Sequence, residues 1–174
     1  MFILIGNLDL FQILEVMIFK KLKEIFDQLP EMVIGGKNFK PQFHFGTQEQ
    51  LVAYLSLKRK SGEKYYPLIY LQTPFEESDT MEFTFILATL NKNVSMTNWE
   101  RLDITFGTTL EPLLDNLIVA IKQSGIFYMT DEFSKENRGS KYFNYHVTPD
   151  IWDAIEYKIN VRYRSDCKIK KIYF

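Results

Sequence analysis

Two histidines are the side chains of this chain best suited to proton transfer near neutral pH, because the pKa of imidazole lies close to that range. His44 and His146 each lie inside an aromatic stretch that predicts a β-strand. A histidine in such a stretch is more often packed than catalytic. The chain also contains no Gly-x-Ser-x-Gly segment, which marks one class of serine nucleophile. We therefore expect no catalytic residue, although a triad assembled in space needs no local signature.

Clustered carboxylates are the next candidates for chemistry, because their oxygens bind hard cations. Glu76, Glu77, Asp79 and Glu82 lie close together, but they lack the alternating ligand spacing and central glycine of a calcium loop. A solvated connection between two strands is the preferred interpretation. The single cysteine, Cys167, excludes an intrachain disulfide and a thiolate metal site. We expect no metal and no cofactor, and a reducing compartment.

An enzyme remains the least favoured interpretation. Its acids would be Asp103, Glu111 and Asp115, gathered in a cleft that the sequence order hides. No motif supports this arrangement, so we expect that the chain is not an enzyme.

The composition predicts one folded domain without a strong electrostatic field. The chain has 174 residues, of which 46% are hydrophobic and 16% aromatic, and no linker-like stretch divides it. Its 21 basic and 22 acidic residues nearly cancel, which argues against long-range attraction to nucleic acid or to a membrane. We expect a single α+β domain over residues 1–174, in which residues 168–174 form a possible extended tail.

Apolar residues recur at helical spacing in residues 8–29 and 108–125, which predicts two long amphipathic helices. Thr108 and Glu111 have capping-box spacing at the start of the second helix. A shorter helix over residues 47–62 begins with another such box. The predicted strands comprise residues 43–45, 67–72, 82–90, 101–106, 142–147 and 155–163.

Residues 155–163 alternate without error between apolar and polar side chains, which predicts a strand with one covered face. Arg101, Asp103 and Thr105 alternate with Leu102, Ile104 and Phe106, which predicts a strand over residues 101–106 with one solvated and one buried face. Residues 130–141 are expected to form a polar loop. Together these elements predict an α+β fold. Its mixed, mainly antiparallel sheet packs against two long amphipathic helices and one shorter helix.

Several segments follow one another in a set order, namely residues 64–71, 74–77, 83–89, Arg101, 106–107, 110–113 and 152–162. This order resembles that of the tail-terminator and tail-completion (neck ring) proteins of tailed phages, especially those of Bacteroides-type phages and prophages. The similarity spans roughly residues 8 to 165 and consists of fold and packing motifs.

The resemblance implies a structural virion protein of the neck or tail, made in the cytoplasm of the bacterial host. Such proteins form homo-oligomeric rings, commonly six- or twelve-fold, beside tail-tube, neck or portal-associated proteins. DNA passes through the lumen without sequence-specific binding, and no membrane takes part. A closed ring uses heterologous contacts between two different surfaces of each subunit.

Residues expected outside the core are our candidates for the subunit interface. They lie in two polar connections and in the tail, which could add an edge strand to another subunit. They are Phe75, Glu76, Glu77, Asp79, Phe133, Arg138, Ile169, Ile172, Tyr173 and Phe174. The alternative is a small cytosolic adaptor that binds a partner protein through the same surfaces.

Overall fold

The computed structural model describes residues 10–61, 66–73, 80–90, 96–139, 152–164 and 167–174. The predicted strand over residues 142–147 lies outside them. In chain order the elements are α1 (Leu10–Phe26), β1 (Met32–Ile34), β2 (Lys37–Phe39), β3 (Gln42–Gly46), α2 (Gln48–Ser61), β4 (Leu68–Gln72), β5 (Met81–Leu90), α3 (Asn98–Glu100), η1 (Arg101–Leu110), α4 (Glu111–Ser124), β6 (Phe127–Gly139) and β7 (Trp152–Tyr163).

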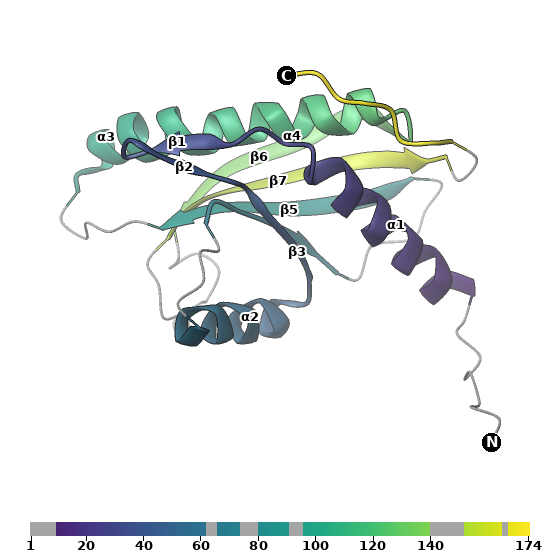
Figure 1. Cartoon of the computed structure of the whole chain (residues 1–174), viewed down its shortest axis with the longest axis horizontal. Helices are drawn as coiled ribbons and strands as arrows, with labels where there is room; N and C mark the ends of the chain where they lie inside the picture. The colour runs from purple at the N-terminus through teal and green to yellow at the C-terminus, as the bar shows by residue number, and fades with distance from the viewer. Residues whose placement is uncertain (1–9, 62–65, 74–79, 91–95, 140–151, 165–166) are drawn as a thin grey trace.

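A five-stranded sheet in the order β3-β4-β5-β7-β6 forms the centre of the fold. Figure 1 shows this sheet between α4 and α2. The pair β3 and β4 is parallel, and the other three pairs are antiparallel. The expected mixed, mainly antiparallel sheet of an α+β protein is therefore confirmed. The strand over residues 155–163 is confirmed as part of β7, where Ile155, Tyr157, Ile159 and Val161 are buried.

Helices cover both faces of this sheet. On one face α1 and α4 pack over a large apolar cluster that includes Leu22, Phe85 and Leu117. On the other face α2 covers a smaller cluster that includes Leu55 and Trp152. Each such side chain stabilises the fold by about 1.5–3 kcal/mol through burial.

The capping box predicted before the shorter helix is present. The backbone N–H of Thr47 donates to the Gln50 side chain at 2.8 Å, and the N–H of Gln50 donates to the Thr47 hydroxyl at 3.4 Å. The phenol of Tyr70 donates to the Thr47 carbonyl at 2.7 Å. These bonds fix the start of α2 against β4.

The predicted strand over residues 101–106 is wrong, because these residues are helical. Helix α3 begins after Thr97 and continues through π-helical η1 into α4 as one helix of 27 residues. The N–H of Glu111 bonds to the carbonyl of Phe106, five residues earlier. Pro112 has no N–H and its ring needs space, which the wider turn before it provides.

This helix is also the one segment among the described residues that is long and apolar enough to span a membrane. Half of its most apolar 18-residue window is buried inside the protein. The core helix of a soluble protein has the same properties.

Residues 130–141 were expected to form a polar loop, which is wrong for most of them. Through Gly139 they belong to β6, which pairs with β7 and has a register irregularity between Met129 and Phe133. All side chains from 131 to 137 are exposed. Backbone hydrogen bonds to β7, rather than an apolar face, define this strand.

His44 gives the stability of the fold a pH dependence. Its ring stacks on Tyr54 of α2, with centroids 4.0 Å apart. Burial, and then the charge of Lys58, lower the pKa of His44 below its ordinary value of 6.5. Because this pKa is lower in the folded than in the unfolded chain, the contribution to stability is complete above 6.5 and is lost as the pH falls through the folded value.

We therefore expect a His44→Asn chain to lose less stability than the unchanged chain between about pH 7.5 and about pH 5. Urea unfolding of both chains at the two pH values measures this difference. Equal losses would show that His44 makes no contribution.

Candidate interaction surfaces

The exposed large apolar side chains of the described residues include three groups that lie on separate surfaces. The first is the helix-start patch, formed by Trp99, Leu102 and Ile104. The second is the edge strand β6, and the third is the C-terminal patch, formed by Tyr173 and Phe174 with neighbouring lysines. Exposed apolar groups that gather on a monomer commonly mark sites of protein association.

The helix-start patch contains the most exposed large apolar side chain described. Trp99 is 78% exposed, and Leu102 and Ile104 are 42% and 57% exposed. The backbone beneath them is fixed by a capping box. The N–H of Thr97 donates to the Glu100 carboxylate at 2.7 Å, and the N–H of Glu100 donates to the Thr97 hydroxyl at 3.3 Å. Hydrogen bonds from the backbone and then the hydroxyl of Thr97 lower the pKa of Glu100 below its ordinary value, so its carboxylate keeps its charge to lower pH.

An ion pair anchors the same end of the helix to the sheet. Arg101 Nε donates to Asp153 Oδ1 at 2.9 Å, and Nη2 donates to the same oxygen. Asp153 lies at the start of β7, and its side chain is fully buried, whereas Arg101 is partly exposed. The pair therefore connects the helix-start patch to the beginning of β7, an interior strand of the sheet.

Strand β6 is one edge of the sheet, and within the described part of the chain no strand pairs with its outer side. Phe133 is 65% exposed and its ring lies 6.0 Å from that of Tyr157. Lys135 bonds to Glu111 at 2.5 Å, which ties this strand to the start of α4. An edge of this kind can pair with a strand from another chain.

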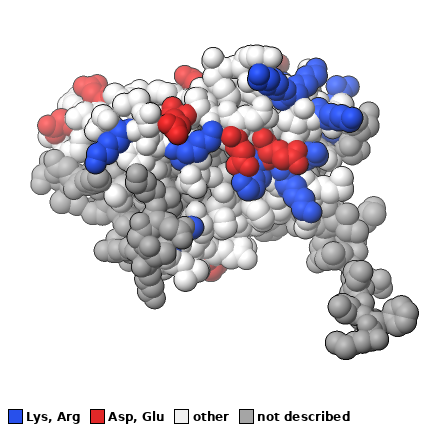
Figure 2. Space-filling model, viewed as in Figure 1, with Lys and Arg blue, Asp and Glu red and all other residues white. Residues whose placement is uncertain are grey.

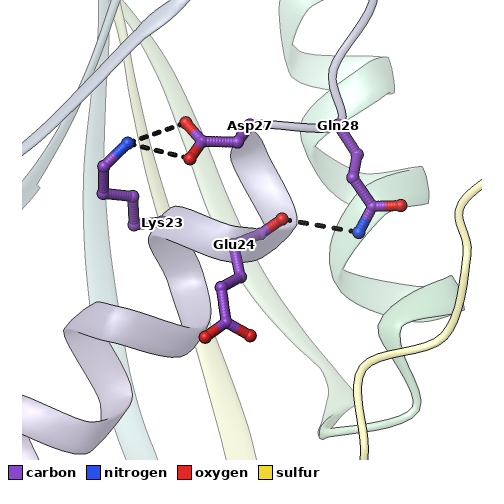
Figure 3. A network of polar contacts seen from close by, with 4 residues as sticks. All are labelled: Lys23, Glu24, Asp27 and Gln28. Carbon is purple, nitrogen blue, oxygen red and sulfur yellow. Dashed lines mark hydrogen bonds and ion pairs between the residues drawn. The ribbon is translucent and has the colours of Figure 1, made fainter.

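The C-terminal patch is held against the ends of α1 and α4. Ile172 is buried in the large cluster, and its N–H donates to Gln28 Oε1 at 3.1 Å. Gln123 binds both backbone groups of Tyr173, at 2.9 and 3.1 Å. Figure 3 shows Gln28, whose Nε2 bonds to the Glu24 carbonyl while its Oε1 points away. Tyr173 and Phe174 follow the buried Ile172 and are 68% and 52% exposed.

The structure does not bring the described members of the predicted interface into one surface. Phe133 lies on β6, whereas Tyr173 and Phe174 lie beside the C-terminal end of α4. Ile172 is buried and Ile169 half-buried in the chain's own core, so both side chains contribute to that core. The described residues do not include Phe75, Glu76, Glu77 and Asp79. The side chain of Arg138 is not described either.

The three acids of the enzyme alternative do not share a cleft. Asp103 and Asp115 are exposed and lie roughly three turns apart on one helix. Glu111, between them, binds Lys135.

The helix-start patch was missed in the sequence because Leu102 and Ile104 were assigned to the buried face of the strand over residues 101–106, and Trp99 was assigned to no element. The signal that finds it is the Thr97 to Glu100 spacing, which is that of a capping box. Comparison with protein-family models and with curated proteins gave no match. The resemblance to tail terminators therefore remains a prediction from the sequence.

Proposed function

We propose that this chain is a structural subunit that acts by assembling into a ring at the neck or tail end of a phage. The observation that supports the proposal best is that exposed aromatic side chains lie on separate surfaces with an anchored backbone. Trp99, Phe133 and Tyr173 occupy the start of the long helix, an edge strand and the C-terminal segment. A ring subunit needs two different surfaces for its neighbours and further surface for the rings or tubes beside it.

The proposed position on the virion, at the neck or tail end, rests on the resemblance in segment order. The α+β fold is compatible with that station, because a sheet covered by helices provides a rigid body with projecting edges. In this proposal the partners are copies of the same chain and the adjoining tail-tube, neck or portal-associated proteins. DNA passes through the lumen without sequence-specific contacts.

Negative-stain electron microscopy of the purified chain at high concentration tests this function. We expect closed rings of uniform diameter, six- or twelve-fold by the resemblance. Single particles with the 20.7 kDa mass of one chain at every concentration would contradict the proposal.

A further inference from the structure

The two ends of the long helix differ in charge. Its start carries exposed Glu100 and Asp103, whereas Lys122 is exposed near its end. The C-terminal segment beside that end adds three exposed lysines, Lys168, Lys170 and Lys171. Figure 2 shows acidic side chains at the left end of the upper edge and a group of basic side chains at the right end.

Neighbouring charges do not cancel this difference in charge between the two ends of the helix. Two acidic residues at the end of α1 are paired with lysines of that helix. Glu24 lies 3.4 Å from Lys21, and Asp27, directly after the helix, lies 2.8 Å from Lys23 (Figure 3 shows the second pair). At the helix start Arg101 is paired with buried Asp153. The hairpin strand β1 packs against η1, and Lys37 on its partner strand adds one positive charge there.

We propose that two copies of this chain associate head to tail, with the C-terminal patch of one copy on the helix-start patch of the next. This inference rests on the ring proposed above and names the contact that builds it. The patches have opposite charge, and each exposes aromatic surface, Trp99 in one and Tyr173 with Phe174 in the other. Aromatic anchors surrounded by complementary charges are the usual composition of a strong interface.

Both patches are ordered before they meet. The capping box and the Arg101 to Asp153 pair fix one, and the Gln123 bonds and buried Ile172 fix the other. Association therefore orders little additional backbone, which lowers its entropic cost.

The two patches cannot meet within one chain. They lie at opposite ends of a 27-residue helix, on the order of 40 Å apart. A contact between different surfaces of identical subunits repeats from copy to copy and closes into a ring when the rotation allows it.

Complementary variants test the contact. The tail variant carries Lys171→Glu, Tyr173→Ser and Phe174→Ser, and the helix-start variant carries Trp99→Gln, Asp103→Lys and Ile104→Gln. All six positions are exposed, so both variants should fold, which circular dichroism verifies. A matched control is Leu57→Gln, because Leu57 is 67% exposed on α2, on the other face of the sheet.

For each variant alone, self-association should be weaker than that of the unchanged chain by a factor of at least about thirty. The control should self-associate as strongly as the unchanged chain. Mixed together, the tail variant and the helix-start variant should form a complex of twice the mass of one chain and nothing larger, because one intact patch of each kind remains. Raising the salt concentration should weaken that complex.

Each other outcome overturns the inference. Variants that assemble like the unchanged chain would place the contact elsewhere and leave the proposed ring standing. Variants that lose assembly but form no mixed complex would show that the two patches do not bind each other. An unchanged chain that stays monomeric at every concentration would overturn both the contact and the ring.

Discussion

Replacing Arg101 by methionine should lower the free energy of unfolding by about 3–5 kcal/mol. The substitution removes the guanidinium from Asp153, whose side chain is fully buried at the start of β7. A buried carboxylate that loses its charged partner keeps its desolvation cost and loses the compensating attraction. Urea unfolding followed by circular dichroism measures the change.

Replacing the partner, Asp153, should lower the free energy of unfolding by less, and this difference makes the prediction specific. In an Asp153→Asn chain the remaining charge belongs to Arg101, which is 29% exposed and can be solvated. We expect about 1–3 kcal/mol for that change. The matched control is Asp27→Asn, which breaks an exposed pair with Lys23 and should cost under about 1 kcal/mol. Equal costs for Arg101→Met and Asp27→Asn would show that the buried pair does not anchor the helix.

Replacing Phe85 by alanine should also destabilise the fold by about 3–5 kcal/mol. Phe85 lies on β5 and has no exposed surface. Its ring centroid lies 5.9 Å from that of Phe26 and 5.8 Å from that of Phe83, and both contacts are edge to face. The substitution leaves a cavity between α1 and the sheet that these neighbours fill only in part. Thermal and urea unfolding of the purified variant measure the loss.

Phe133→Ala is the matched control, since it removes the same side chain from another strand of the sheet. Phe133 is 65% exposed, so its loss should change stability by well under about 1 kcal/mol. If both substitutions destabilised the chain equally, the assignment of Phe85 to the centre of the core would be wrong.

The sequence predicted the elements whose local pattern agrees with their final environment. In β7 the side chains alternate between the core and the other face, and the chain shows that alternation directly. In α2 the Thr47 and Gln50 box depends on residues three apart, so it too is visible locally.

The wrong predictions concern segments whose local pattern does not agree with their final environment. Six alternating residues from Arg101 to Phe106 fit a strand, but the helix nucleated at Thr97 continues through them. Strand β6 shows no apolar alternation between residues 131 and 137, so no local pattern predicts it. Its pairing with β7 defines it instead. The C-terminal segment is held by Gln28, and these two parts of the chain lie 144 residues apart. No local pattern encodes a contact of that range.

The candidate interface was predicted only in part for the same reasons. Tyr173 and Phe174 were selected because they lie outside the expected core, and both are exposed. Ile172 was selected on the same grounds but is buried, since the tail folds back over α1 and α4. Trp99 was not selected, although it is the most exposed large apolar side chain described.

The absolute mass of the purified chain, measured by light scattering over a wide range of concentration, tests the central claim most directly. We predict a discrete assembly whose mass is a fixed multiple of 20.7 kDa, six or twelve by the resemblance, and which dissociates only on dilution. A mass of 20.7 kDa at every concentration would contradict the claim that this chain works by assembling with copies of itself.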